Sequence, residues 1–328
     1  MVSLVSRVIL VAPRGFCAGV VRAVDTVEAA LERYGPPIYV RRAIVHNPHV
    51  VKRLADLGAV FVQELDEVPI GARVVFSAHG VAKSVPEEAR ARGLFAIDGT
   101  CPLVGKVHGE VLRFLDEGYE VVLIGHASHD EVIGTLGQAP GRVHLVTRAA
   151  DVDVLPIPVG SRVAVVTQTT LSPDDVEPVL RALAARFPSL AQPRTEDVCF
   201  ATRNRQMAVR WLAKSTDLVL VLGDRTSSNS IRLREVAHSM GTPAHLIGSI
   251  AELDESWLDG VSVVGITAGA STPESIVQEA VEHFRSRGAE VVEETLQRES
   301  IVFHLPREVA IGRAGNGAPP GSAANVGH

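Results

Sequence analysis

Cysteine is scarce in this chain, with only Cys17, Cys101 and Cys199 among 328 residues. No two of them are close in sequence, which excludes a zinc-ribbon spacing and a ladder of disulfides. The odd number also prevents complete pairing within one chain. The apolar run 8–12 stops at Pro13-Arg14 without the length or cleavage pattern of a signal peptide. Few cysteines and no export signal indicate a reducing, cytoplasmic location.

Several other features are missing. Aromatic residues make up only 4% of the chain, and the net charge of −6 excludes a general basic field for nucleic acid. No apolar run approaches the roughly 20 residues that span a membrane. The chain has neither a GxxxxGK[ST] phosphate loop nor a GxGxxG turn after its first apolar run, so a nucleoside triphosphate or dinucleotide cofactor is not indicated.

What is present is an alternation of short apolar runs with helical patterns, which predicts an α/β fold with mostly parallel sheets. The expected strands include 8–11, 73–76, 121–124, 163–166, 218–221 and 261–266, and the expected helices 20–34, 104–118, 174–187, 201–215 and 273–287. A coarse threefold repeat predicts three α/β domains at 1–99, 100–194 and 195–311, each with one cysteine. The segment 312–328, rich in Gly, Ala, Pro and Asn, is expected to be disordered.

Each cysteine lies between a strand-like run and a helix. A single cysteine in such a chain is more often a small buried apolar residue than a ligand. Three in equivalent settings make ligation about as probable as burial. Three thiolates brought together would leave a soft metal or cluster one ligand short of four, and that open position is where chemistry could occur.

Polar residues cluster at the ends of the expected strands, where ligands of parallel sheets bind. Imidazoles, hydroxyls and an amide at these positions suit a phosphorylated substrate. The stretches are 46–49, 77–80, 125–131, 167–170, 227–230 and 267–271. Glu131, two residues after His129, could deliver a proton beside a metal site, although such a carboxylate is more often a solvated helix start.

These motifs together resemble the IspH/LytB family of 4-hydroxy-3-methylbut-2-enyl diphosphate reductases. The resemblance spans roughly 8–306 and rests on Gly15-Phe16-Cys17-Ala18-Gly19-Val20, His46-Asn47, Phe76-Ser77-Ala78-His79-Gly80, Thr100-Cys101-Pro102-Leu103-Val104, Gly125-His126 with His129 and Glu131, Thr167-Gln168-Thr169-Thr170-Leu171-Ser172, Cys199 with Ala201-Thr202 and Asn204-Arg205-Gln206, Ser227-Ser228-Asn229-Ser230 and Thr267-Ala268-Gly269-Ala270-Ser271.

The resemblance implies three α/β domains with pseudo-threefold symmetry around a central four-iron four-sulfur cluster. By matching position, its ligands are Cys17, Cys101 and Cys199, and the fourth iron has no cysteine. The implied substrate-binding residues are His46, His79, His129, Thr169, Ser227, Ser228, Asn229 and Ser271, and the implied proton relay is Glu131 with His129 and Thr169. Asp130 departs from the proline expected there, and 223–226 differ from the family's lead into Ser-Ser-Asn.

The implied reaction is the reductive dehydroxylation of 4-hydroxy-3-methylbut-2-enyl diphosphate to isopentenyl and dimethylallyl diphosphate, the last step of the methylerythritol phosphate pathway. Ferredoxin or flavodoxin is the implied electron donor; no nucleic-acid or membrane partner is expected. Two other interpretations use the same residues: a non-redox iron–sulfur hydratase, and a redox-sensing protein that binds a phosphorylated metabolite without converting it. A zinc enzyme with three thiolate ligands is a third.

Overall fold

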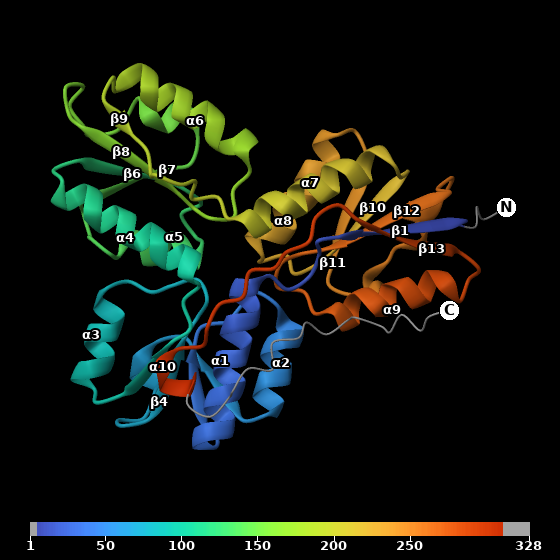
Figure 1. The fold of residues 1–328 in the computed structure, drawn as a ribbon, viewed down its shortest axis with the longest axis horizontal. Helices are drawn as coiled ribbons and strands as arrows, with labels where there is room; N and C mark the ends of the chain where they lie inside the picture. The colour runs from blue at the N-terminus through green and yellow to red at the C-terminus, as the bar shows by residue number, and fades with distance from the viewer. Residues whose placement is uncertain (1–4, 311–328) are drawn as a thin grey trace.

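Residues 5–310 are described by the computed structural model, and Figure 1 shows them as three lobes, each with a sheet flanked by helices. Every strand pairing in this range is parallel. Parallel sheets need helices on their faces, because each strand is joined to its neighbour by a crossover. The predicted α/β class with three mostly parallel sheets is therefore confirmed. The segment 312–328, expected to be disordered, lies outside the described residues.

The first sheet has the order β3-β2-β4-β5 and forms the blue to cyan lobe of Figure 1. Its strands are β2 (Ile38–Arg41), β3 (Ala59–Val62), β4 (Arg73–Phe76) and β5 (Phe95–Asp98). The helices of this lobe are α1 (Ala18–Tyr34), α2 (Pro48–Asp56) and α3 (Ser84–Ala91). Alanines and valines of α1 share one buried cluster with β2, which fixes the helix on the sheet.

The second sheet has the order β7-β6-β8-β9 and forms the green lobe. Its strands are β6 (Glu120–Ile124), β7 (Val143–Val146), β8 (Val163–Thr167) and β9 (Leu190–Ala191). Its helices are α4 (Pro102–Asp116), α5 (Asp130–Leu136) and α6 (Pro173–Arg186). Helix α6 begins as the sequence predicts, with Ser172 as N-cap before Pro173, and the Ser172 hydroxyl accepts from the Asp175 N–H at 3.2 Å.

The third sheet has the order β11-β10-β12-β1-β13. Its strands are β1 (Arg7–Ala12), β10 (Leu218–Leu222), β11 (Ala244–Ile247), β12 (Val263–Ala268) and β13 (Glu290–Thr295), and its helices are α7 (Phe200–Lys214), α8 (Ser228–Ser239) and α9 (Glu274–Arg285). Strand β1, which the sequence analysis places in the unit 1–99, pairs here with β12 and β13. Figure 1 shows this blue strand among the orange ones. Its apolar pattern predicts a strand but carries no information about its partners.

The three sheets share one strand order. In the first two sheets, the first strand along the chain lies second from the edge, the next takes the edge, and the third lies on the other side; β10, β11 and β12 take the same three places in the third sheet. The fourth place is taken by β5, by β9 and, in the third sheet, by β1. The helix that follows this fourth strand (α1, α4 or α7) packs on the next sheet. The chain therefore passes from one lobe to another after each strand in the fourth place.

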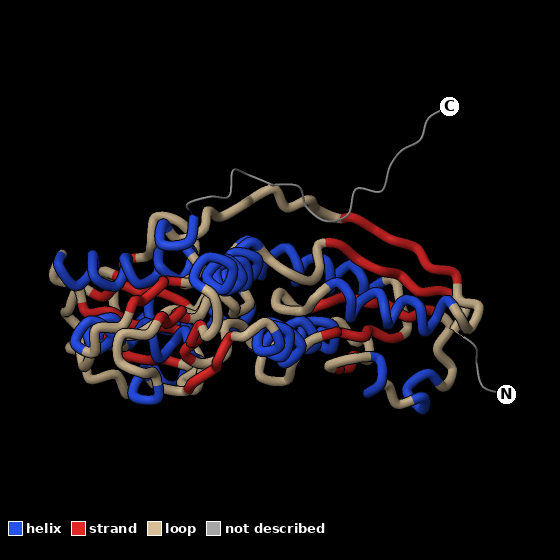
Figure 2. The backbone as a smooth tube through the Cα atoms, turned by 90° about the horizontal axis from the view of Figure 1, so that it is seen from below, coloured by secondary structure: helices blue, strands red, loops and turns tan. Residues whose placement is uncertain are grey.

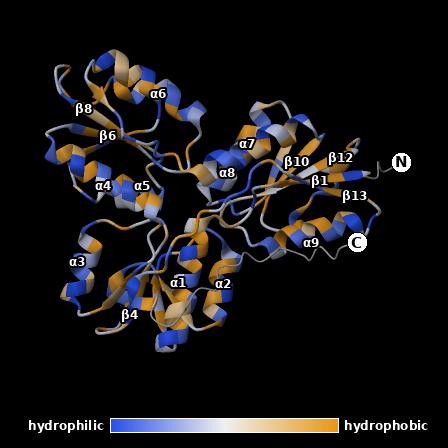
Figure 3. Ribbon diagram, viewed as in Figure 1, coloured by the Kyte–Doolittle hydropathy of each residue, from blue (hydrophilic) through white to orange (hydrophobic). Residues whose placement is uncertain are grey.

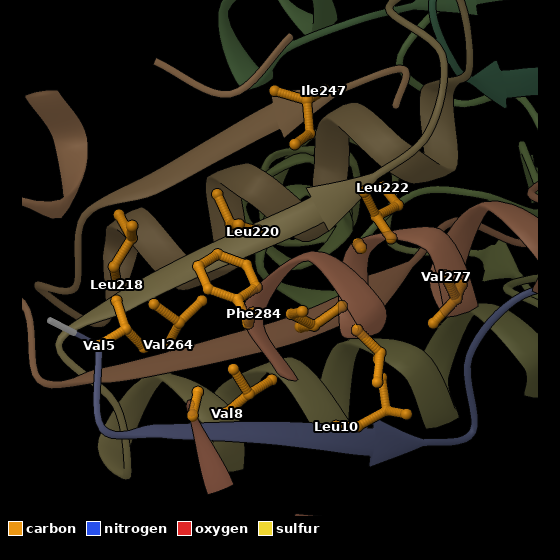
Figure 4. Close-up of a cluster of buried hydrophobic side chains, with 14 of the residues drawn as sticks. Val5, Val8, Leu10, Leu218, Leu220, Leu222, Ile247, Val264, Val277 and Phe284 are labelled. Atoms are coloured by element: carbon orange, nitrogen blue, oxygen red, sulfur yellow. The ribbon is translucent and has the colours of Figure 1, made fainter. Parts of the chain in front are cut away.

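Apolar side chains fill the space between sheets and helices. In the third lobe, Figure 4 shows the strand residues Val8, Leu10 and Leu220 facing Val277 and Phe284 of helix α9. Burying an aliphatic or phenyl side chain of this kind contributes about 1.5–3 kcal/mol. In Figure 3 the helices carry both orange and blue residues, as expected for helices with one face on a sheet and one in solvent.

A segment after β13, residues 296–306, leaves the third sheet and reaches the first lobe, where α10 (Arg307–Ala310) packs on α1. We call it the C-terminal strap; Figure 2 shows it as a tan tube along one edge of the molecule. Four short 3₁₀ helices, at 65–67, 149–152, 250–252 and 255–258, complete the described elements. Within residues 5–310, no helix has the length and apolar character needed to cross a membrane.

Candidate three-thiol site and its polar pocket

The three cysteines occupy equivalent places in the fold. Each is the N-cap of the first helix after the chain passes from one lobe to another. Cys17 caps α1, Cys101 caps α4 and Cys199 caps α7. Each backbone N–H donates to a carbonyl two residues beyond the end of β12, β4 or β8. The acceptors are Ala270 at 3.2 Å, Ala78 at 2.9 Å and Thr169 at 3.0 Å, in that order. The backbone thus delivers one thiol from each lobe in the same way.

The thiols of Cys17 and Cys101 both lie near Gly19. A Cβ at this position would lie 2.6 Å from the Cys101 sulfur and 3.8 Å from the Cys17 sulfur, so a side chain here would displace them. Burial raises the pKa of the Cys101 thiol to about 12, and the nearby Cys17 and Cys199 thiols add to this shift. Burial also raises the pKa of the Cys199 thiol to about 11, with a further contribution from Cys17. All three thiols are free of disulfides.

The spacing of the sulfurs bears on what they could hold. A tetrahedral zinc with Zn–S bonds of about 2.3 Å requires sulfurs about 3.8 Å apart. In the described part of the chain, the sulfurs of Cys17, Cys101 and Cys199 do not all lie within 4.8 Å of one another. A cluster separates its ligands because each cysteine binds a different iron. Three thiols that are not all within 4.8 Å of one another do not match one tetrahedral zinc ion, and they leave room for a larger centre.

Three histidines from two lobes meet beside this centre. The rings of His46 and His79 stack with centroids 4.2 Å apart, and the His129 ring lies 5.4 Å from His46 and 5.7 Å from His79. Two of these residues follow β2 and β4 in the first sheet, and His129 caps α5 in the second. Strand ends of neighbouring lobes thus form one wall.

Burial favours the neutral form of these imidazoles, because it lowers the pKa of each. It lowers the pKa of His46, with Asp130 opposing the shift, and lowers that of His79 well below its usual range. It lowers the pKa of His129 to about 4, with the His46 charge adding to the effect. His46 Nε2 and His79 Nδ1 are buried without a hydrogen-bond partner among the described residues. Neutral rings with unpaired nitrogens can donate to an anionic ligand.

Asp130 joins this wall. One of its carboxylate oxygens lies 3.9 Å from His46 Nε2, and the other contacts the Arg42 guanidinium. Single ligand atoms of His46, His79 and Asp130 all lie within 4.8 Å of one another, so a divalent cation could also bind there. Asp130 stands where the family pattern has proline, and its place in the sequence predicts neither of these contacts.

Glu131 is buried next to the thiols, with 3% of its surface exposed. Its two oxygens accept from the Thr169 N–H at 2.7 Å and from the Thr169 hydroxyl at 3.0 Å. Burial raises the pKa of this carboxyl to about 7, although both hydrogen bonds from Thr169 lower it. A carboxyl with this pKa can hold or release a proton near neutral pH.

Hydroxyl and amide groups of the third lobe complete the pocket. Ser227 caps α8, and its hydroxyl accepts from the Ser230 N–H at 3.3 Å. Both side-chain polar atoms of Asn229 are buried without a partner. The Ser271 hydroxyl donates to the His46 carbonyl at 3.0 Å, which ties the third lobe to the first.

From the sequence, Thr170 could pass a proton or orient a hydroxyl, whereas Gln168 has no predicted role of its own. The Thr170 and Ser228 hydroxyls lie 3.0 Å apart, and Gln168 Nε2 donates to Thr170 at 2.8 Å. This contact joins the second lobe to the third, as Ser271 joins the third to the first and the histidine rings join the first to the second.

All of the predicted site residues therefore lie in two neighbouring regions, the three-thiol site and the polar pocket. The Thr167-Gln168-Thr169-Thr170 run was the available signal.

The fold and these residues define an α/β protein of three parallel sheets, with a three-thiol centre beside a pocket suited to an anion. The chain belongs to the LytB family: residues 8–285 match the family described as LytB protein. The resemblance predicted from the motifs is confirmed.

Relatives and solved structures agree with this assignment. The 4-hydroxy-3-methylbut-2-enyl diphosphate reductase of Acidothermus cellulolyticus is 52% identical over 323 residues, which cover 98% of this chain and 95% of the relative. That of Chromohalobacter salexigens is 54% identical, over 90% of this chain and 95% of the relative. The solved E-1-hydroxy-2-methyl-but-2-enyl-4-diphosphate reductase of Plasmodium falciparum superimposes with a TM-score of 0.90 at 38% identity, over 93% of this chain and 96% of that one.

Proposed function

We propose that this chain catalyses the reductive dehydroxylation of 4-hydroxy-3-methylbut-2-enyl diphosphate to isopentenyl and dimethylallyl diphosphate, the last step of the methylerythritol phosphate pathway. The relatives described above carry the name of this reductase. The observation that carries the proposal is the meeting of three thiols from three lobes beside the buried Glu131–Thr169 pair.

The proposed cofactor is a four-iron four-sulfur cluster held by Cys17, Cys101 and Cys199, with no cysteine on its fourth iron. The free thiols, the cradle at Gly19 and the spacing of the sulfurs support this assignment. When bound, the cluster supplies electrons and a Lewis-acidic site for the hydroxyl of the substrate. The thiols must lose their protons on binding, and the positive iron offsets the cost of burying their charge.

The diphosphate is proposed to bind among His46, His79, His129, Ser227, Ser228, Asn229 and Ser271. Supporting this, the pocket offers unpaired imidazole nitrogens, the unpaired amide of Asn229 and the N-terminus of the 12-residue helix α8. Hydrogen bonds to an ionised acceptor are about twice as strong as neutral ones, and a helix N-terminus favours negative charge. Substrate binding would therefore satisfy groups that the free protein leaves buried and unpaired.

Glu131 is proposed as the proton donor, with Thr169 and His129 as its relay. Two electrons and two protons enter per turnover. One proton joins the departing hydroxyl as the C–O bond breaks, so that water leaves. The second is added to either end of the remaining allylic group, which accounts for two isomeric products. With a pKa of about 7, Glu131 is protonated in part of the population at neutral pH and can supply the first proton.

We further propose that the protein acts in the cytoplasm and receives its electrons from a ferredoxin or flavodoxin. A reducing compartment suits three unpaired thiols that must remain available as ligands.

The test is an anaerobic assay with the reconstituted protein, a chemical reductant and the substrate. The expected result is two electrons consumed for each product molecule, with iron and sulfide present in the protein. Conversion of the substrate with no electron consumed would support a hydratase, and tight binding without conversion would support a metabolite sensor. Either result would overturn the proposed reduction.

A further inference from the structure

Each helix that begins at a cysteine carries a cationic side chain in its second turn. Arg22 is on α1, Lys106 on α4 and Arg205 on α7. None of the three has a role in the proposed reaction, and only Arg205 falls in a motif that the sequence analysis quotes. Each of the three donates at least one hydrogen bond to a loop that precedes a cysteine.

Arg22 binds the loop that leads to Cys101. Its Nη1 donates to the Thr100 carbonyl at 2.8 Å and its Nη2 to the Asp98 carbonyl at 3.3 Å. The Thr100 carbonyl belongs to the peptide bond directly before Cys101. The helix that starts at Cys17 therefore fixes the backbone that carries Cys101.

Lys106 binds the loop that leads to Cys199. Its Nζ donates to the carbonyls of Thr195 at 2.6 Å and Glu196 at 3.0 Å, and to Asp197 Oδ1 at 3.0 Å. The Asp197 carboxylate is itself buried and accepts from the Thr167 N–H at 2.9 Å. The helix that starts at Cys101 thus fixes the backbone that carries Cys199.

Arg205 closes the circle at the loop that leads to Cys17. Its Nη2 and Nε donate to the Gly15 carbonyl at 2.8 Å and 3.2 Å, and Nη2 also reaches the Phe16 carbonyl at 3.4 Å. Gly15 has φ +63°, in the left-handed region, so this loop depends on backbone geometry that few other residues adopt. Arg205 has 1% of its surface exposed, and its charge is paired with Glu299 at 3.0 Å.

The C-terminal strap holds two of the three contacts from outside. Glu299 binds Arg205, and the His304 carbonyl accepts from Arg22 Nε at 2.9 Å. At the third contact, Asp197 is the acidic partner of Lys106, as Glu299 is of Arg205. A buried cation needs such a partner, because removing its charge from water without one is costly.

We infer that Arg22, Lys106 and Arg205 are positioning residues that form a closed ring, the cation ring, in which each cysteine-bearing helix sets the loop of the next cysteine. Their role is to hold the three sulfurs at the separation that the cluster requires before it binds. This inference rests on the proposed function, since it assumes that the thiols hold a cluster. Outer partners that orient metal ligands typically change metal affinity about 10–100-fold when they are lost.

Lys106 offers the sharpest test because its side chain is 26% exposed, so its replacement disturbs the core least. It also borders a surface hollow of about 510 Å³ that reaches Cys199. The variants are Lys106→Met, which removes the cation, and Lys106→Arg, which keeps it. The control is Arg113→Gln on the same helix, because Arg113 pairs with Glu110 and Glu117 of α4. Arg22→Gln provides an independent test of a second contact in case Lys106→Met fails to fold.

Each protein is reconstituted anaerobically. Iron and sulfide per chain, the rate of iron release to an excess of chelator, and the melting temperature of the metal-free chain are then measured. We expect Lys106→Met and Arg22→Gln to release iron at least about tenfold faster than wild type, with little change in the metal-free melting temperature. Lys106→Arg should largely restore slow release, and Arg113→Gln should match wild type.

Release at the wild-type rate from fully loaded Lys106→Met and Arg22→Gln would overturn the cation ring and leave the proposed function standing. A wild-type chain that binds no iron and sulfide would instead overturn both. If iron is released faster only from variants whose metal-free chain also melts at a lower temperature, these residues contribute to general stability. That result would also overturn the ring.

Discussion

Thr169 binds both carboxylate oxygens of Glu131, with its N–H on Oε1 at 2.7 Å and its hydroxyl on Oε2 at 3.0 Å. The carbonyl of the same threonine accepts from the Cys199 N–H at 3.0 Å. One residue therefore fixes both the proposed proton donor and a proposed cluster ligand. The distance between the acid and the metal centre is thus set by a single stretch of backbone.

Replacing Glu131 by Gln should leave substrate binding nearly intact and slow turnover by about 10²-fold or more, because general acid catalysis typically contributes 10²–10⁴-fold. The glutamine keeps the shape and can still accept from Thr169, but it has no proton to give. Single-turnover kinetics under anaerobic conditions measure the chemical step. Thr135→Val on the same helix is the control, since its hydroxyl bonds only the backbone of its own helix, at the Glu131 carbonyl. An unchanged rate for Glu131→Gln would remove it from the relay.

The pH dependence of turnover should reflect the same carboxyl. Burial raises the pKa of Glu131 to about 7, and a general acid works only while protonated, so the rate should decline as the pH rises above about 7. The same raised pKa makes the contribution of Glu131 to the free energy of unfolding greatest below about pH 4.5, and that contribution is lost as the pH rises through about 7. A rate profile for wild type and Glu131→Gln checks this, because the decline should be absent from the slow variant.

Asn229 should matter for diphosphate binding and not for folding. Both of its side-chain polar atoms are buried without a partner in the free protein, so Asn229→Ala removes no hydrogen bond and should not lower the melting temperature much. Binding of inorganic diphosphate should weaken roughly tenfold or more, since a hydrogen bond to a charged group contributes about 1.5–3 kcal/mol. Calorimetric titration measures this. Ser239→Ala at the far end of α8 is the matched control, and equal affinity of both variants for diphosphate would contradict the assignment.

Much of the fold could be predicted because the apolar runs of parallel strands are buried on both faces and are therefore easy to recognise. The runs 73–76 and 121–124 became β4 and β6 almost residue for residue. The partner of β1 could not be predicted, because the run 8–11 fits any buried parallel strand. Its place beside β12 and β13 depends on contacts more than 250 residues away. The domain boundaries near 99 and 194 remain predictions.

The residues of the site also divide into those that the sequence could predict and those that it could not. The motifs predicted the three cysteines, the histidines and Glu131 as site residues, because these residues occur together, at the ends of several expected strands. Lys106 and Arg22 gave no such signal, since a basic residue on a helix is ordinary and its contact with a distant loop is visible only in three dimensions. Contacts to backbone carbonyls leave no mark on the sequence of the loop that receives them.

Replacing any one of Cys17, Cys101 and Cys199 by Ser should lower the iron and sulfide content after anaerobic reconstitution. A hydroxyl is a poorer ligand for iron than a thiolate, because it is harder and keeps its proton at neutral pH. Chemical iron and sulfide counts, together with the visible absorption spectrum, make the measurement. Full loading of the triple variant would show that the thiols are not the ligands.

Asp130 places a negative charge where the proposed diphosphate binds, 3.9 Å from His46 Nε2. Asp130→Asn removes that charge, so inorganic diphosphate should bind more tightly. The expected gain is roughly fivefold, equivalent to about 1 kcal/mol, a modest Coulomb energy at an effective dielectric of about 20. The pKa of His46 should fall further, because Asp130 is the main group that raises it against burial. Calorimetry at two salt concentrations and nuclear magnetic resonance titration of the imidazole check both effects, and the gain in diphosphate affinity should shrink at high salt.

Glu64→Gln is the control for Asp130→Asn: it frees Arg42 from its 2.8 Å partner while leaving Asp130 in place. Weaker diphosphate binding by Asp130→Asn would mean that the carboxylate supports the pocket through Arg42 instead of opposing the substrate.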